Sequence, residues 1–518
     1  MSKRLKDIGV VSLLTIASRV LGLARDSFTL AVFGTTWLTD AFYTAYNLPN
    51  LFRRLLAEGS LTAAFIPTLH DELHVRNRAG AFALLSNVAS WLFVVTGVLV
   101  LFAMAVFSQS RAFGGYEAKY YVAADLTVLL FPYLLLVSLA AAFSATLNVL
   151  DHFTEPALSP IWLNLAMIAS LGGAGLHFAH GPMGEIHWLC AGVLVGGFFQ
   201  MAVPGAVLIS LGWRPRVDLS LSPRVREIGA LMAPGLFGTA IYQINILVSR
   251  LLAFRLHDSG VTGMFNMNRL MEFPIGVFAI AISTVVYPLI ARHATERNWD
   301  AMGADFRKGL RLILVLNIPA GVGLALLSHP IVRLLYAHGK TTDADANSMA
   351  ALLGYFAVGM PFFSAVNLVV RAFYAVKDTR TPVKVATFDF FVNVGLSLAL
   401  MGSLGVRGLV IASTLAIIVQ TALLVAALSR RIPTMNLSLL LPSLWRIAAG
   451  TGLMAGVVIL GLRFGEHLSM PRHGVDLAEV VLLIPLAVAA YATVLWLLRI
   501  EGREDLAQVL GKLRKKRA

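Results

Sequence analysis

Residues 40–69 read DAFYTAYNLPNLFRRLLAEGSLTAAFIPTL, a long and mostly apolar stretch with the composition of a membrane-spanning helix. The middle of this stretch nevertheless carries Arg53, Arg54 and Glu58. A charged side chain near the centre of a bilayer costs about 2.5–3.5 kcal/mol on insertion scales, and such residues usually mark functional sites. The stretch therefore predicts a helical membrane fold with a charged site inside it.

The composition of the whole chain supports this interpretation. The 518 residues are 58% hydrophobic and only 14% charged, whereas soluble domains average about 25% charged residues. Only helices and closed barrels satisfy the backbone inside a bilayer. A barrel needs alternating polar and apolar residues, and the run WLFVVTGVLVLFAMAVF at 91–107 shows none. We therefore expect an all-α polytopic membrane protein.

Several classes of function are disfavoured by the sequence. Cys190 is the single cysteine, so we expect no internal disulfide and no metal cluster. The sequence contains no P-loop, HExxH or G-x-S-x-G motif, so neither an enzyme nor a bound cofactor is expected. In a soluble protein, a net charge of +14 would suggest binding to nucleic acid. In a membrane protein the meaning of the charge depends on which side of the membrane the basic residues lie. No nucleic-acid partner and no cleavable signal peptide are expected.

Hydropathy predicts fourteen membrane spans, with both termini cytoplasmic because lysine and arginine are concentrated in the segments on one side. A weak internal repeat relates spans 1–6 to spans 7–12: Phe131-Pro132 resembles Met360-Pro361, and Gln200 resembles Gln420. We therefore expect two pseudo-symmetric six-helix lobes, at 1–215 and 216–432, followed by two further helices and a basic tail at 433–518. The predicted spans are 10–33, 38–69, 82–107, 121–149, 157–178, 186–211, 226–254, 262–291, 312–328, 349–374, 385–402, 408–428, 447–462 and 478–498.

The basic residues inside these spans are all arginine, which suits bidentate contact with phosphate or carboxylate. Arg250 and Arg371 lie near span ends, where they can reach the interface. The other five face only two deep glutamates, Glu58 and Glu272, so the site is expected to attract an anion such as pyrophosphate or a sugar carboxylate. The alternative is that the Arg–Glu pairs only hold helices together. The five deep arginines are Arg19, Arg25, Arg53, Arg54 and Arg269.

The sequence around these residues resembles the MurJ (MviN) lipid II flippases of bacteria, within the superfamily that includes multidrug/sodium antiporters and polysaccharide exporters. The stretches that carry the resemblance are SRVLGLARD at 18–26, TDAF at 39–42, LPNLFRR at 48–54, AEG at 57–59, RLMEFP at 269–274, GK at 339–340 and the residues at 373–384. The chain departs from the family at Asn268, where an aspartate is usual, so a second acid is missing at that position.

The resemblance implies a flippase that moves lipid II, an undecaprenyl-diphosphate-linked disaccharide-pentapeptide, from the cytoplasmic to the periplasmic leaflet of the inner membrane by alternating access. It implies a central cationic cavity and a gate at Asp40. The substrate-binding residues carried over are Arg19, Arg25, Arg53, Arg54, Glu58, Arg269 and Glu272.

The energy source and the substrate leave alternatives open. Membrane potential could drive transport, or sodium could bind at Asp389 and Asn393, one helical turn apart in the eleventh predicted span. Three other functions remain: export of another prenyl-linked saccharide, cation–drug antiport, and a scaffold without transport. We expect a monomer whose partners are the lipid substrate and the surrounding membrane lipids.

Overall fold

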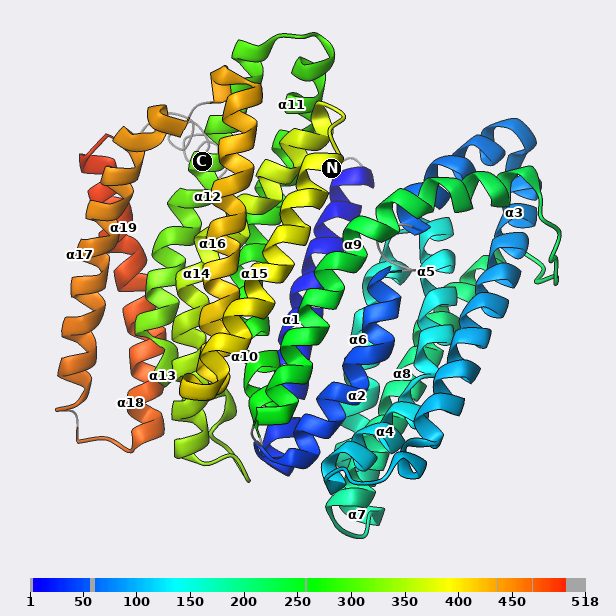
Figure 1. Cartoon of the computed structure of the whole chain (residues 1–518), viewed down its shortest axis with the longest axis horizontal. Coiled ribbons are helices and arrows are strands. Elements are labelled where there is room, and N and C mark those ends of the chain that lie inside the picture. Colours follow the sequence, from blue (N-terminus) through cyan, green and yellow to red (C-terminus); the bar gives the residue numbers. More distant parts are fainter. Residues whose placement is uncertain (1–2, 56–60, 257–258, 436, 468, 500–518) are drawn as a thin grey trace. The chain divides into compact units, whose positions relative to one another are not determined.

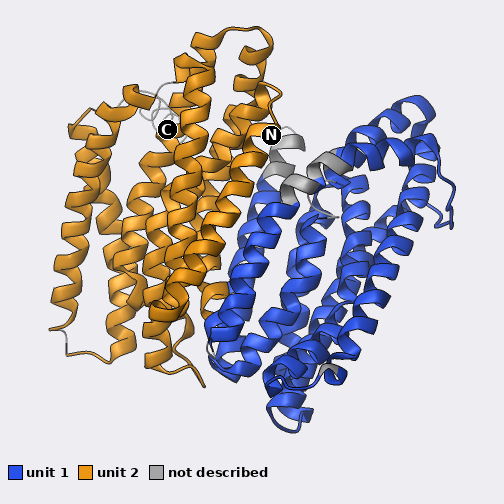
Figure 2. Ribbon diagram, in the orientation of Figure 1, with its two compact units in different colours: residues 1–262 blue, residues 263–518 orange. Residues whose placement is uncertain are grey.

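The computed structural model describes residues 3–55, 61–256, 259–435, 437–467 and 469–499 (Figure 1). Within these ranges the chain forms helices joined by turns and short extended segments, without β-strands. The predicted all-α class is therefore confirmed for the described residues. Glu58 and the basic tail lie outside them. The chain divides into two compact units, residues 1–262 and 263–518 (Figure 2).

Eleven helical segments in the described part of the chain are long and apolar enough to cross a membrane. They coincide with the predicted spans 3–6 and 8–14, and the chain is accordingly a multi-pass membrane protein. Helices also occupy the other three positions, namely α1 (Lys3–Phe33), α2 (Trp37–Arg53) and α9 (Pro223–Leu256). The count of fourteen spans and the cytoplasmic location of the termini stay predictions.

In the first unit the helices pack in a chain of neighbours. Helix α1 contacts α6, α6 contacts α8, α8 contacts α5, and α5 contacts α3, while α2 packs on α4 and α9. The remaining elements of this unit are α3 (Leu61–Ser108), η2 (Ser110–Phe113), α4 (Ala118–Leu130), α5 (Tyr133–Val149), α6 (Thr154–Ala169), η3 (Ser170–Gly175), α7 (Leu176–Phe178) and α8 (Gly181–Ser210).

Helix α3 differs from the sequence prediction. Residues 70–81 were expected to form a loop between two spans, but they are helical on both sides of Asn77. Asn77 has φ 57°, a left-handed conformation that asparagine tolerates better than most residues. The two helical parts of α3 are therefore separated by a single residue, where a loop was predicted.

Helices α6 and α8 approach each other closely because α8 presents glycines at Gly192 and Gly196. A Cβ atom added at Gly196 would lie 2.8 Å from the Cα atom of Leu163, and one added at Gly192 would lie 2.9 Å from the Cα atom of Met167. Small residues four apart allow such backbone contact between membrane helices. This contact fixes the spacing of two helices that carry site residues.

The second unit is built around α12, which contacts α11, α14 and α17. Helix α14 also packs on α16, and α16 packs on α15. The elements of this unit are the main part of α10 (Gly260–Pro274), then η4 (Ile275–Ala279), α11 (Ile280–Thr295), α12 (Trp299–Leu326), α13 (Ser328–Tyr336), α14 (Asp343–Ala375), α15 (Arg380–Leu404), α16 (Val406–Arg431), η5 (Pro433–Met435), η6 (Leu437–Leu440), α17 (Leu441–Gly465), α18 (Arg472–Ala478), η7 (Glu479–Leu483) and α19 (Ile484–Leu497).

The last helices are held to the second unit by a buried ion pair. Arg333 of α13 donates from Nε and Nη2 to the carboxylate of Asp476 in α18, at distances of 2.5–3.2 Å. Both side chains are almost fully buried. Breaking such a pair by removing one partner strongly destabilises a protein, so α18 is firmly anchored to α13.

The unit boundary at residue 262 follows the packing of α9. This helix contacts α2 and α3, and it therefore belongs with the first unit. The predicted lobe boundaries at 215/216 and 432/433 follow the sequence repeat and not the density of contacts. These lobe boundaries stay a prediction.

Candidate functional site

Arg25 lies inside the first unit with only 3% of its surface exposed. Its Nε and Nη2 atoms donate to Oδ1 of the adjacent Asp26, at 2.9 and 2.5 Å. Its Nη1 atom donates to Oδ1 of Asn164 at 3.1 Å. The Asn164 amide in turn donates to the backbone carbonyl of Ser18 at 3.1 Å. Arg25 thus forms a buried ion pair within α1 and is joined to α6 through the Asn164 amide.

This pairing changes the charge balance predicted for the site. The sequence prediction compared the charges of five arginines and two glutamates and did not count Asp26. In the structure Asp26 is buried and neutralises Arg25 directly. The expected excess of positive charge is therefore smaller by one pair, while the role of Arg25 in binding a substrate stays a prediction.

Two tyrosines connect Arg25 with Arg53. Tyr46 of α2 and Tyr133 of α5 lie within electrostatic range of both arginines. Their ring centroids are 6.4 Å apart, and the Tyr133 hydroxyl donates to Oε1 of Gln200 in α8 at 3.1 Å. The structure therefore assembles one polar cluster from α1, α2, α5 and α8.

Arg53 ends α2 and lines a cavity of about 260 Å³ inside the first unit. Its Nε atom donates to Oδ1 of Asn50 at 3.0 Å, and the Asn50 amide donates to the Tyr46 carbonyl at 2.8 Å. These contacts orient the guanidinium at the end of α2, where the cavity begins.

The cavity is lined by α3, α5, α6 and α8 in addition to α2. Apolar and proline residues form the rest of its wall, and the lining residues include no acidic side chain among those that the structure describes. One cation surrounded by hydroxyl and amide groups suits an anionic or sugar-like ligand. The polar lining residues are Arg53, Thr62, Ser144, Asn148, Ser159 and Gln200.

Sequence reasoning missed most of this lining. Apart from Arg53, which was predicted to bind the substrate, only Gln200 was singled out from the sequence, and only as part of the internal repeat. Ser144, Asn148 and Ser159 are common residue types in membrane helices, so nothing in the sequence sets them apart. The signal that could have found them is spacing, since Ser144 and Asn148 are one helical turn apart and share a face of α5.

Other predicted residues occupy less enclosed positions. Arg19 on α1 and Arg54 after α2 are half-buried. Arg250, expected to reach the interface, instead donates from Nη1 to Oδ1 of Asn47, so it links α9 to α2. Glu58 lies outside the described residues, and its predicted contact with Arg54 stays a prediction.

Asp40 has a defined structural role at the start of α10. Its carboxylate is 1% exposed and accepts hydrogen bonds from the backbone N–H groups of Val261 and Thr262, at 3.3 and 2.8 Å. The Thr262 hydroxyl also donates to it at 2.5 Å. A carboxylate at a helix N-terminus satisfies orphan N–H groups and complements the helix dipole. Asp40 therefore caps the first residues of α10, which belong to the first unit, and its role as a gate stays a prediction.

The charged residues predicted in the eighth span lie on α10. Arg269 is half-buried and Glu272 is exposed within its unit. Asn268 donates from Nδ2 to Oε1 of Glu272 at 2.9 Å. An aspartate at position 268 would instead place two carboxylates together, so the asparagine gives Glu272 a hydrogen-bond donor. The predicted convergence of these charges with those of α2 stays a prediction.

The sodium hypothesis concerns two residues on α15. Asp389 is 9% exposed, and Asn393 is buried one turn further along. The Asn393 side-chain oxygen accepts hydrogen bonds from Ser413 at 3.3 Å and Ser397 at 3.5 Å. Both side chains are thus buried, with two hydroxyl groups bound to Asn393, and ion binding there stays a prediction.

The described helices define a multi-pass membrane protein, and its first unit contains a polar cavity lined by Arg53. A family model described as "Lipid II flippase MurJ" matches residues 30–471. The chain belongs to the MurJ lipid II flippase family.

Relatives and solved structures agree with this assignment. A probable lipid II flippase MurJ of Rhizobium tropici is 30% identical, with 97% of this chain and 95% of the relative covered. A probable lipid II flippase MurJ of Vibrio cholerae is also 30% identical, with 97% and 98% covered. A structure titled "Lipid II flippase MurJ, inward closed conformation" shares the fold, with a TM-score of 0.74, 22% identity, and 93% and 97% of the two chains covered.

The fold is shared more widely. An inward-facing multidrug resistance MATE transporter of the MOP superfamily matches with a TM-score of 0.60 and 16% identity, with 82% of this chain and 94% of that chain covered. At this identity the likeness concerns the fold alone. Sequence and structure therefore place the chain in one family within a larger group of helical membrane proteins, as the sequence resemblance predicted.

Proposed function

We propose that this protein is a lipid II flippase of the bacterial inner membrane. It moves the undecaprenyl-diphosphate-linked disaccharide-pentapeptide from the cytoplasmic to the periplasmic leaflet. The observation that carries this proposal is the family match over residues 30–471. The arginine-lined polar cavity in the first unit supports it, because the substrate headgroup combines a diphosphate with sugar and peptide groups.

In the proposed mechanism Arg53 contacts the anionic or sugar part of the headgroup, and Asn148, Ser144 and Gln200 supply further hydrogen bonds. Arg25 acts mainly as a positioning residue, because its guanidinium already holds Asp26 and Asn164. Arg19, Arg54 and Arg269 complete a central cationic cavity, which opens to the two sides of the membrane in turn. Glu58 and Glu272 orient arginines and weaken binding enough for release.

The energy source in this proposal is the membrane potential, which acts on a charged cavity with about 2.3 kcal/mol per charge per 100 mV. Sodium binding at Asp389 and Asn393 is the alternative. Transport by Asp389→Asn separates the two. If sodium binding at this site drives transport, the variant loses the sodium dependence of transport. If the membrane potential drives transport, the variant keeps its dependence on the potential.

Among the other functions, export of a different prenyl-linked saccharide shares the same cationic chemistry. Binding of purified headgroups separates the two. Cation–drug antiport would suit an acidic, aromatic-lined cavity, whereas the described lining of this cavity contains an arginine and no acidic side chain. This observation favours an anionic substrate.

The test is rescue of a bacterial strain depleted of its lipid II flippase, combined with transport of labelled lipid II in proteoliposomes. The wild-type chain is expected to rescue growth, while Arg53→Ala and Arg54→Ala insert normally and lose transport. The matched control is Arg111→Ala, which removes an exposed arginine paired with Asp125. Normal membrane insertion of the wild-type chain without rescue or lipid II transport would overturn the proposal.

A further inference from the structure

The segment between α8 and α9, residues 213–222 with the sequence WRPRVDLSLS, is extended and lies along α3. We refer to these ten residues as the strap. In Figure 1 the strap runs beside α3 at the edge of the first unit. Its chemistry is not used by the proposed transport site, and its two faces differ sharply.

The inner face of the strap is fastened to α3 by hydrogen bonds. Asn87 donates to the backbone carbonyls of Asp218 and Ser220, at 2.8 and 2.9 Å. The Ser90 hydroxyl accepts from the Asp218 N–H at 2.9 Å, and the Trp91 indole donates to the Ser220 carbonyl at 3.2 Å. Polar side chains of α3 therefore satisfy the backbone of the strap.

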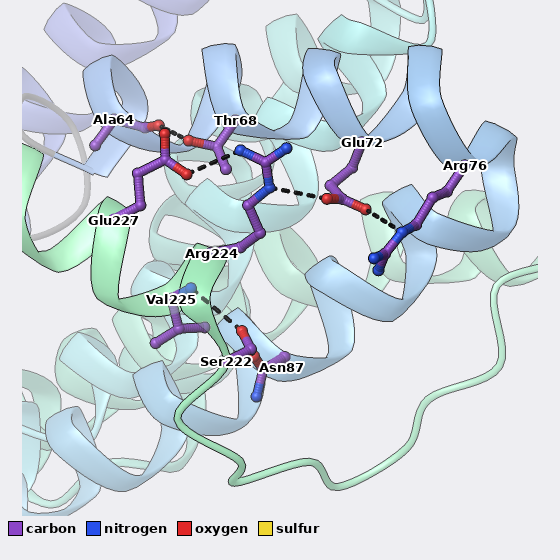
Figure 3. Close-up of polar contacts among 9 residues, drawn as sticks. All are labelled: Ala64, Thr68, Glu72, Arg76, Asn87, Ser222, Arg224, Val225 and Glu227. Atoms are coloured by element: carbon purple, nitrogen blue, oxygen red, sulfur yellow. Dashed lines mark hydrogen bonds and ion pairs between the residues drawn. The ribbon is translucent and has the colours of Figure 1, made fainter.

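Both ends of the strap are also anchored. At its start the Trp213 indole is buried and donates to the Ser86 hydroxyl at 2.9 Å. At its end Ser222 donates to Asn87 at 2.7 Å (Figure 3). Two residues further on, Arg224 donates to the buried carboxylate of Glu72 at 2.9 Å. The strap is thus held in one register along α3.

That register turns three apolar side chains outward. Val217, Leu219 and Leu221 occupy every second position and are 86%, 48% and 56% exposed. Alternation is expected because successive side chains of an extended segment point to opposite faces. Arg214 and Arg216, near the start of the strap, are exposed as well. The outer face therefore combines apolar and basic groups.

The strap lies at the level where α3 enters its apolar region. Directly beyond Trp91, α3 exposes Phe93, Val98 and Leu101, the kind of surface that faces lipid in a membrane protein. Tryptophan is enriched at membrane–water interfaces, and Trp91 bonds to Ser220 of the strap. The outer face of the strap is therefore continuous with a lipid-facing surface.

We propose that the strap is an interfacial lipid-binding element. Val217, Leu219 and Leu221 enter the boundary between headgroups and acyl chains, and Arg214 and Arg216 bind the phosphates of anionic phospholipids. An apolar face beside basic residues is the pattern of elements that lie in the membrane interface. The partner is the bilayer itself, so this inference does not depend on which substrate is transported.

The experiment uses the full chain with Cys190→Ala, which leaves no other cysteine. Single cysteines replace Val217, Leu219 or Leu221, and each carries a fluorescent label. The protein is placed in nanodiscs of phosphatidylcholine, with or without phosphatidylglycerol. Fluorescence is quenched either by lipids brominated near the headgroup or by iodide in water. The matched control is a label at Arg297, an exposed position in the turn before α12.

The expected result is strong quenching of the strap labels by brominated lipid and protection from iodide, with the reverse at position 297. Phosphatidylglycerol should increase the lipid quenching, and Arg214→Gln with Arg216→Gln should remove that increase. Iodide quenching of the strap labels equal to that at position 297 would overturn the proposal and point to a protein partner. If quenching by brominated lipid were the same with and without phosphatidylglycerol, the assignment of anionic lipid as the partner would be overturned.

Discussion

Arg25 and Arg53 lie within reach of the same two tyrosines, yet their surroundings differ. Arg25 is enclosed, with its charge neutralised by Asp26 and its Nη1 atom donating to Asn164 and to the Met167 sulfur. Arg53 has an amide partner in Asn50 and faces a polar cavity. The comparison teaches that similar positions in the sequence give different surroundings: Arg25 is bound by other groups of the protein, whereas Arg53 borders a polar cavity.

The largest expected effect is the loss of stability in Arg25→Ala. This change removes the ion-pair partner of the buried Asp26 carboxylate, and breaking a buried ion pair in this way costs about 3–5 kcal/mol in other proteins. Thermal unfolding of the purified protein in detergent should show a large drop in the midpoint temperature.

The control is the double variant Arg25→Ala with Asp26→Ala, which removes both charges and should recover part of the loss. If Arg25→Ala alone were as stable as the wild type, the holding role of Arg25 would be wrong.

Asn164→Ala is expected to have the next largest effect. It removes an acceptor from Arg25 and the bond from α6 to the Ser18 carbonyl, at a cost of about 1–3 kcal/mol for groups left unsatisfied. Thermal unfolding measures the change. Asn367→Ala serves as the control, because Asn367 bonds only to a carbonyl of its own helix in the described structure. Equal losses in both variants would argue against a specific link between α1 and α6.

Tyr133→Phe tests the connection between the two arginines. The change removes the hydroxyl that donates to Gln200, so a loss of about 0.5–1.5 kcal/mol is expected. Transport of lipid II should fall more than stability does, because Gln200 lines the cavity beside Arg53. A variant with unchanged transport would show that the tyrosine pair does not shape the cavity.

Arg53→Ala is expected to abolish transport while destabilising the protein less than Arg25→Ala does. The loss of its charge-assisted hydrogen bond to Asn50 contributes about 1.5–3 kcal/mol. Unfolding and transport should be measured on the same preparation. If Arg53→Ala were destabilised as strongly as Arg25→Ala, the contrast between the two residues would not hold.

The sequence predicted the helical membrane class well, because apolar length is a local property. The arginines within the spans are also visible in the sequence, but their binding roles stay predictions. The sequence did not predict the partner of Arg25. Adjacent helical residues do not face each other in the usual pairing rules, so Asp26 was not considered, and Asn164 lies 139 residues away. The lining of the cavity was not predicted either, because its residues are also far apart in the sequence. Ser144, Ser159 and Gln200 come from three helices that only packing brings together.

The close contact of α6 and α8 at Gly192 and Gly196 has a mechanical consequence. Asn164 on α6 holds Arg25, and Gln200 on α8 holds Tyr133. Backbones in direct contact cannot slide past each other without steric overlap. The two helices therefore move as one rigid unit that carries both Asn164 and Gln200. Any change in the shape of the cavity must then come from movement of α2, α3 or α5, the other helices that line it.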